Sequence, residues 1–175
     1  MTERASQLRR RLRWWTTVLI LGLVFSGITA LPLPAELHLL ARWLGAENFS
    51  PEQARFTQWV LLVRDGLNDT NAKYPFMAYA TDWLAFAHIV LALAFVGALR
   101  HPVRNAWLFT FGMVASACIV PWALIMGGVR AIPVGWRLID CAFGIAGFIP
   151  CWLNHRWAHE LERLHVHAAR PGFKT

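Results

Sequence analysis

Charged side chains are scarce in this sequence. Asp, Glu, Lys and Arg account for 15% of the 175 residues, whereas a soluble domain usually contains about 25%. Hydrophobic residues make up 57%, above the usual value of about 45–50%. A domain of this size leaves much of its surface in contact with solvent, so its interior cannot hide so many apolar side chains. The composition argues against a soluble globular protein and predicts an integral membrane protein.

Cysteine is also rare. Cys118, Cys141 and Cys151 each lie in an apolar run, and none belongs to a CxxC pair. A quinone-linked thiol oxidoreductase needs a reactive cysteine pair near the membrane surface, so this class is disfavoured. The chain also lacks a P-loop, a GxSxG motif and a glycine-rich dinucleotide motif. We expect no cofactor, and these absences leave open whether the protein is an enzyme.

Acidic residues are few, since 10 Asp and Glu are outnumbered by 17 Lys and Arg, which gives a net charge of +7. In a soluble protein such a charge would suggest a nucleic-acid partner. No basic face interleaved with exposed aromatic residues is present. Instead, 11 of the 17 basic residues fall in the N-terminus, the turn at 100–104 and the C-terminal tail. We therefore expect a lipid bilayer, and no nucleic acid, as the partner.

Four largely apolar runs are long enough to cross a hydrocarbon layer of about 30 Å. They cover residues 14–33, 76–99, 106–126 and 134–153, approximately. The sequence predicts an all-α integral membrane protein, a four-transmembrane-helix bundle that forms a single membrane domain over 1–175. Residues 34–75 form a large outer loop, and a cytoplasmic tail helix covers 154–170. The distribution of Lys and Arg places both the N- and C-termini in the cytoplasm, because basic residues accumulate on that side.

The outer loop carries signals of two short amphipathic helices. Apolar residues recur at helical spacing over 37–44, and Gly45 is a natural C-terminal stop. Ser50 begins a capped helix pattern, with proline at the first helical position and glutamine at the third, and Gly66 is the expected end. Both segments are too short and too charged to span a bilayer. We expect them, like the amphipathic tail helix at the C-terminus, to lie on the membrane surface or to cap the bundle.

Four ionisable residues fall inside the predicted spans, Asp82 and His88 in the second and Arg137 and Asp140 in the fourth. Such groups are costly in hydrocarbon and often functional. Counted at about 1.5 Å per residue, Asp82 and Asp140 lie about 9 Å below the outer helix ends and Arg137 about 4–5 Å. Arg137 would be the centre, because a guanidinium can hold two carboxylates. The cluster is interpreted either as a ligand or proton site or as a structural ion cluster.

Small residues follow one face of the fourth span. At spacings of three and four, this face carries Arg137, Asp140, Gly144, Gly147 and Cys151. Gly112 and Ser116 form a second pair of small residues on the third span. Because small residues let membrane helices approach closely, we expect another helix to pack against each of these faces.

His88 lies about 18 Å from the outer end of its span, near the middle of the membrane. A b-type haem would need a second axial histidine at that depth, and the chain offers none. We expect a hydrogen bond from His88 to a hydroxyl such as that of Thr110 or Ser116. A proton relay is the alternative.

In the tail, His155 and His159 have the i, i+4 spacing of a helical metal pair, and Glu162 completes one face. The zinc-protease pattern fails, because Arg163 stands where the second histidine belongs. Apolar residues on the opposite side favour an amphipathic surface helix. We therefore predict no metal, with His155 and His159 as weak candidates only.

Two stretches, YPFMAYATDWLAFAH over residues 74–88 and RAIPVGWRLIDCAFG over residues 130–144, contain the four ionisable groups of the spans. They resemble segments of a family of small bacterial polytopic inner-membrane proteins of uncharacterised activity. The resemblance implies a bacterial inner membrane and nothing catalytic.

These observations favour a non-catalytic bundle that binds a lipid or other apolar ligand, or a membrane partner subunit, through its outer-leaflet half. The motivation is a polar cluster roofed by two amphipathic segments. One alternative is a small membrane enzyme that uses Asp82, Asp140 and His88 for proton transfer. Another is a proton-coupled transporter, which four helices could form only as a homo-oligomer.

Overall fold

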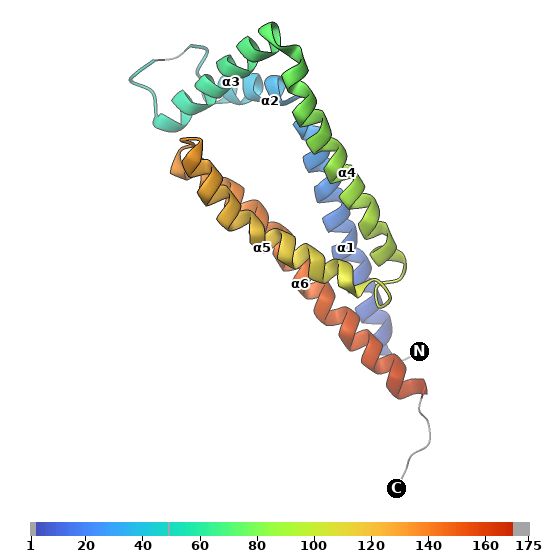
Figure 1. Cartoon of the computed structure of the whole chain (residues 1–175). Coiled ribbons are helices and arrows are strands. Elements are labelled where there is room, and N and C mark those ends of the chain that lie inside the picture. The colour runs from blue at the N-terminus through green and yellow to red at the C-terminus, as the bar shows by residue number, and fades with distance from the viewer. Residues whose placement is uncertain (1–2, 49, 170–175) are drawn as a thin grey trace. The chain divides into compact units, whose positions relative to one another are not determined.

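A computed structural model describes residues 3–48 and 50–169, which are helical and contain no β-strand (Figure 1). The elements are α1 (Glu3–Ala30), α2 (Leu33–Trp43), α3 (Arg55–Lys73), the short 3-10 helix η1 (Pro75–Ala78), α4 (Tyr79–Arg100), α5 (Ala106–Val129) and α6 (Val134–Ala169). Four stretches, namely α1, η1 with α4, α5 and α6, are long and apolar enough to cross a membrane. The predicted all-α fold with four such helices is confirmed.

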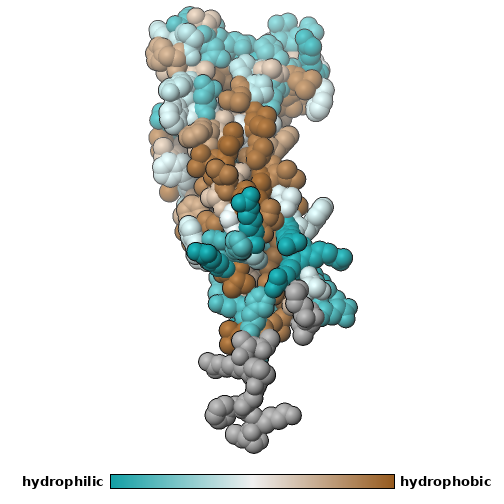
Figure 2. Space-filling view, turned by 90° about the vertical axis from the view of Figure 1, so that its right-hand side faces the viewer, coloured by the Kyte–Doolittle hydropathy of each residue, from teal (hydrophilic) through white to brown (hydrophobic). Residues whose placement is uncertain are grey.

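The long helices direct apolar side chains outward. In the most apolar 18-residue stretch of each helix, no more than 22% of the residues are buried. On α4, the side chains of Trp83, Phe86 and Leu93 are more than half exposed, and Figure 2 shows apolar side chains covering much of one face. Water disfavours so large an apolar surface. The surface therefore suits a lipid environment.

Contacts within the chain divide it into two compact units. The first combines Met1–Gly22 with Leu91–Thr175, and so contains the start of α1, the end of α4, and all of α5 and α6. The second unit, Leu23–Val90, contains the end of α1, the helices α2, α3 and η1, and the start of α4. Each unit is described by itself below.

In the first unit, α5 and α6 pack closely through their small residues. A Cβ atom added at Gly144 would lie 2.8 Å from the backbone oxygen of Ser116, and one at Gly147 would lie 2.6 Å from the Ser116 hydroxyl. A Cβ atom added at Gly112 would lie 2.5 Å from the sulfur of Cys151. All these distances are too short for a real Cβ: at Gly147 and Gly112 a neighbouring side chain would have to shift, and at Gly144 the backbone of α5 would have to move. The sequence predicted that a helix would pack against each of the two small-residue faces, and in the structure these two faces pack against each other.

The turn between α5 and α6 is held by hydrogen bonds to the last carbonyls of α5. The Ile132 N–H donates to the Gly127 carbonyl at 2.8 Å, and the Ala131 N–H donates to the Gly128 carbonyl at 3.1 Å. This pair of bonds is a Schellman motif, which requires a left-handed residue after the helix. That residue is Ala131, with φ of 55°. The same motif ends α2, where the left-handed residue is Gly45, with φ of 66°, as the sequence predicted.

Glycine at position 131 should stabilise the protein. A left-handed backbone costs alanine about 1 kcal/mol or more that glycine does not incur. We expect Ala131→Gly to raise the melting temperature in detergent by about 2–4 °C, the shift typical for about 1 kcal/mol in a chain of this length. The reciprocal change Gly45→Ala should lower it by a similar amount. Differential scanning fluorimetry measures both, and a fall for Ala131→Gly would contradict the assigned turn.

The two ends of the chain pair as helices in the first unit. α1 begins at Glu3, well before the predicted start at residue 14, and α6 continues through the predicted tail helix without a break. Arg4 forms a salt bridge of 2.6 Å with Glu160. Several apolar side chains in these parts of α1 and α6 are almost fully buried, namely Leu8, Leu12, Ala158 and Leu161. The tail is thus helical as predicted, but its apolar stripe is used for helix packing and not for lying on a surface.

In the second unit, α3 differs from the prediction at both ends. One of the two bonds of the predicted capping box forms, since the Ser50 N–H donates to Gln53 Oε1 at 3.1 Å, while the Ser50 hydroxyl accepts from the Glu52 N–H at 3.4 Å. However, they close a separate turn, because the Gln53 N–H donates back to the Ser50 carbonyl at 3.2 Å. α3 therefore begins only at Arg55. Gly66 does not end it, and the polar stretch that follows stays helical to Lys73, which pairs with Asp69 at 3.6 Å.

Candidate functional site

The ionisable residues of α4 lie in the second unit. Asp82 is exposed in the first turn of α4, where a negative charge is favourable because of the helix dipole. His88 donates from Nδ1 to the carbonyl of Leu84, one turn earlier, at 2.8 Å. Gly27 of α1 packs against this turn, since a Cβ there would lie 3.1 Å from the Cβ of His88. The partner of His88 found here is its own backbone, and the hydroxyl partner stays a prediction.

Arg137 of α6 is held by the α5–α6 turn. Its Nε donates to the carbonyl of Ile132 at 2.6 Å. Its aliphatic stem crosses Gly127, because a Cβ added there would lie 2.7 Å from Arg137 Cγ. Asp140 follows one turn later on the same helix, yet the described residues include no salt bridge between Arg137 and Asp140. The expected pairing within α6 is thus replaced by a bond to the backbone of the turn.

The histidines of the tail join neighbouring side chains. His155 Nδ1 lies 3.3 Å from the Thr110 hydroxyl of α5, and the rings of His155 and His159 meet edge to face at 4.5 Å. His159 Nδ1 lies 3.3 Å from a carboxylate oxygen of Glu162. Within residues 3–48 and 50–169, no group of three His, Cys, Asp or Glu is placed to hold a metal ion. The described contacts of these residues therefore link α5 to α6 and join successive turns of α6.

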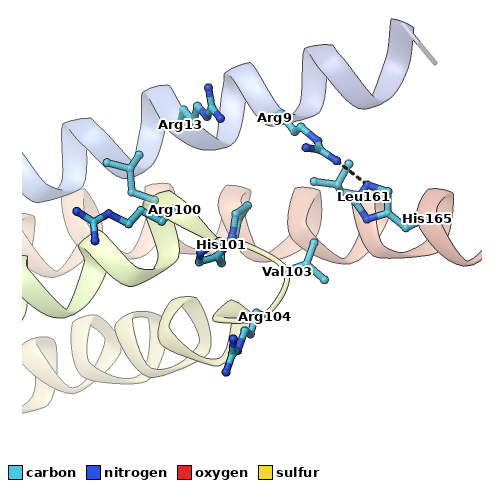
Figure 3. Close-up of a pocket in the computed structure, with 10 residues that line it drawn as sticks. Arg9, Arg13, Arg100, His101, Val103, Arg104, Leu161 and His165 are labelled. Atoms are coloured by element: carbon cyan, nitrogen blue, oxygen red, sulfur yellow. Dashed lines mark hydrogen bonds between the residues drawn. The ribbon is translucent and has the colours of Figure 1, made fainter. Parts of the chain in front are cut away.

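The first unit contains a cavity of about 350 Å³ near the start of α1, the end of α4 and the last turns of α6 (Figure 3). Three helices and one turn line it: Arg9 and Arg13 from α1, Leu99 and Arg100 from α4, residues 101–104 from the turn before α5, and Leu161 and His165 from α6. Segments from the start, middle and end of the sequence therefore meet at this cavity.

The turn that closes one side of the cavity is fixed by Asn105. α4 ends at Arg100, and Pro102 cannot continue a helix because it has no backbone N–H. The Asn105 side chain donates from Nδ2 to the carbonyls of Gly97 at 2.9 Å and His101 at 3.1 Å. These two bonds satisfy carbonyls at the end of α4 and hold the turn in place. Asn105 is a positioning residue that the sequence did not single out.

The polar lining of the cavity is entirely basic. It contains four arginines and two histidines and no carboxylate. Arg9 donates from Nη2 to His165 Nε2 at 2.9 Å; because a guanidinium cannot accept, the histidine nitrogen must be the acceptor. Arg9 Nε is buried and has no protein partner. Among the described residues, no salt bridge involves any of the four arginines. The site can bind an anion.

Sequence reasoning assigned these arginines to the positive-inside rule and did not predict the cavity. The available signal was the pair of basic clusters, at 9–13 and 100–104, on segments that one membrane face can hold together. What the sequence did not reveal is that α1 begins well before its apolar run and that this extension meets the end of α6, the predicted tail helix. These two segments supply the walls between which the clusters meet.

The second unit has its own cavity of about 320 Å³ between α2 and α3. Its lining contains two carboxylates, of Glu47 and Asp65, beside two arginines, and several of its polar groups are paired within the protein. Arg64 forms a salt bridge of 2.7 Å with Asp65 and donates from Nη1 to the carbonyl of Glu47 at 3.1 Å. Asn68 donates to His38 at 3.1 Å. This cavity therefore offers less unmatched charge than the basic one.

Comparison with protein-family models, with curated proteins and with solved structures found no match for this chain, so any function must be argued from the geometry above.

Proposed function

We propose that this protein is a multi-pass membrane protein of a bacterial inner membrane that binds an amphipathic, lipid-like ligand in the basic cavity. The four long apolar helices support insertion into a bilayer. The excess of Lys and Arg at both termini and in the turn at 100–104 supports a cytoplasmic location for these segments. In this orientation the basic cavity lies at the cytoplasmic face.

The cavity itself carries the proposal, because it combines charge with apolar walls. Leu99, Val103 and Leu161 line it beside the arginines. Ligand sites commonly measure about 300–1,000 Å³, so a volume of about 350 Å³ suits a head group rather than a whole lipid. The sequence placed ligand binding in the outer-leaflet half, whereas this cavity supports binding at the opposite end. His88 bonds to a backbone carbonyl, which adds no support to proton transfer or proton-coupled transport.

Filling the cavity should weaken ligand binding. Val103→Trp places an indole in a space that a head group would occupy. Val114→Trp, at an exposed position on α5 outside the cavity, is the matched control. We expect the lipid that stays bound to the purified protein, measured by native mass spectrometry, to fall about tenfold for Val103→Trp, a loss of about 1.4 kcal/mol in binding. Unchanged lipid in this variant would overturn binding in the cavity.

The orientation predicts one-sided labelling in intact cells. Ala72→Cys lies at the end of α3 and Val166→Cys near the end of α6, both at exposed positions. A membrane-impermeant maleimide added outside the inner membrane should label Ala72→Cys and leave Val166→Cys unlabelled. The unsubstituted chain, whose three thiols lie within α5 and α6, gives the background. Equal labelling of both variants would contradict the four-span topology.

A further inference from the structure

The positive charge of the basic cavity indicates the chemical class of its ligand. We propose that it holds the phosphate group of an anionic phospholipid, with the acyl chains lying along the neighbouring apolar helices. This inference rests on the proposed function, because it names the chemical class of the ligand for the same site. It follows from three features: the arrangement of the arginines, the lack of acidic partners in the lining, and the position of the cavity relative to tryptophans.

The arginines approach the cavity from separate elements. Arg9 and Arg13 are four residues apart on α1, so they share one face of that helix. Arg100 comes from the end of α4, and Figure 3 shows Arg9 reaching toward His165 on α6. Guanidinium groups bind phosphate oxygens in pairs through parallel N–H donors. A group with several oxygens can therefore bridge arginines that come from different elements of the lining.

The cavity carries positive charge without a matching acid. Arg9, Arg13, Arg100 and Arg104 line one cavity, and the lining contains no carboxylate to offset their mutual repulsion. Arg9 Nε adds a buried donor without a protein partner, which is costly when left unsatisfied. An anion can both offset the positive charge and accept a hydrogen bond from a free N–H donor, whereas a neutral ligand cannot offset the charge. A phosphate fits this requirement.

The surroundings of the cavity favour a lipid as the source of the phosphate. Trp14 directly follows Arg13, and Trp107 lies three residues after Arg104; both side chains are exposed. Tryptophan is enriched at the boundary between hydrocarbon and head groups. Exposed tryptophans beside the basic lining therefore place the cavity at that boundary. Basic pockets between membrane helices on the cytoplasmic side are suited to anionic head groups.

The test compares lipids that differ only in the head group. The full chain in detergent is titrated with dioleoyl phosphatidic acid and with dioleoyl phosphatidylcholine, and binding is measured by native mass spectrometry. We expect phosphatidic acid to bind about tenfold more tightly or better, because its phosphate is not neutralised by a choline. This comparison uses the unsubstituted protein, so it does not depend on a variant that must fold.

Two double variants with equal charge change locate the site. Arg13→Gln with Arg100→Gln removes two lining arginines, whereas Arg10→Gln with Arg163→Gln removes two exposed arginines outside the cavity. We expect the first pair to weaken phosphatidic acid binding about tenfold or more and the second by less than about threefold, since charges that do not line the cavity act on the lipid only at long range. Equal losses for the two pairs would show general attraction to a basic surface and overturn the site.

The remaining outcomes separate this inference from the proposed function. If both lipids bind equally and Val103→Trp weakens both, the amphipathic-ligand function stands and the phosphate assignment is wrong. If Val103→Trp changes neither, the function proposed for the cavity is wrong as well. Inorganic phosphate in molar excess should displace little bound lipid, because it cannot use the apolar walls. Full displacement would overturn the lipid as the source of the phosphate.

Discussion

Leucine at position 144 should force α5 and α6 apart and strongly destabilise the protein. The Cβ of any residue at this position would lie 2.8 Å from the backbone oxygen of Ser116 and 3.3 Å from the Cβ of Ile119. A backbone oxygen inside a helix cannot move without the helix, so the whole contact must open. Overpacking of this kind costs about 1–3 kcal/mol or more. We expect Gly144→Leu to lower the melting temperature in detergent by about 5 °C or more.

Gly135 provides the matched control on the same helix. A Cβ at Gly135 meets nothing within 4 Å, and leucine is the better helix former. Gly135→Leu should therefore leave the melting temperature unchanged or slightly raised. The measurement is thermal unfolding of the purified proteins followed by tryptophan fluorescence or by loss of the monodisperse peak. If Gly144→Leu is as stable as Gly135→Leu, the close packing of α5 on α6 does not exist.

The helical architecture could be predicted because it depends on composition and chain length. An apolar run of about 20 residues is sufficient to identify a helix that can cross a bilayer. Gly112, Gly144 and Gly147 were also informative, because a small residue on an apolar helix indicates close approach whatever the partner. Gly45 was predicted as a helix end for a similar reason, since its role depends only on the local backbone.

Features that depend on tertiary packing were not predictable in the same way. The capping pattern at Ser50 occurs in a turn and not at the start of α3. The pattern determines which polar groups can bond locally, but it does not determine whether the backbone continues as a helix. Gly66 stays helical within α3, where a glycine costs only about 1 kcal/mol relative to alanine. The start of α1 extends before its apolar run and buries a stripe that includes Leu8, while the tail helix, which was predicted, buries Leu161.

The candidate site also shows which features can be predicted from local sequence and which depend on tertiary packing. Counting depth along a helix suggested that Arg137 could reach carboxylates, but depth does not fix the direction of a long side chain. In the structure, Arg137 Nε bonds to the carbonyl of Ile132, which the turn brings beside it. The basic cavity went unnoticed for the opposite reason. Its arginines already had a sufficient explanation in membrane orientation, and only the packed termini show that they share one space.

Removal of Arg137 should loosen the α5–α6 turn, and neutralising the carboxylates should not restore it. Arg137→Ala removes a charge-assisted hydrogen bond to the Ile132 carbonyl, an interaction of about 1.5–3 kcal/mol. It also removes the aliphatic stem that covers Gly127. We expect Arg137→Ala to lower the melting temperature in detergent by about 4 °C or more. Arg137→Lys should lose most of the same stability, because an ammonium lacks the planar donor at the Nε position.

Substitution of the carboxylates distinguishes two roles for Arg137, namely holding the α5–α6 turn or neutralising an ion cluster. If Arg137 mainly neutralised Asp82 and Asp140, its loss would leave buried charges, and adding Asp82→Asn with Asp140→Asn would recover part of the stability. If Arg137 mainly holds the Ile132 carbonyl, the triple variant should melt as low as Arg137→Ala alone. The structure favours the second result, because the bond of 2.6 Å goes to the backbone and the described residues include no Arg137–Asp140 salt bridge. Recovery in the triple variant would instead establish the cluster and return these residues to the centre of the site.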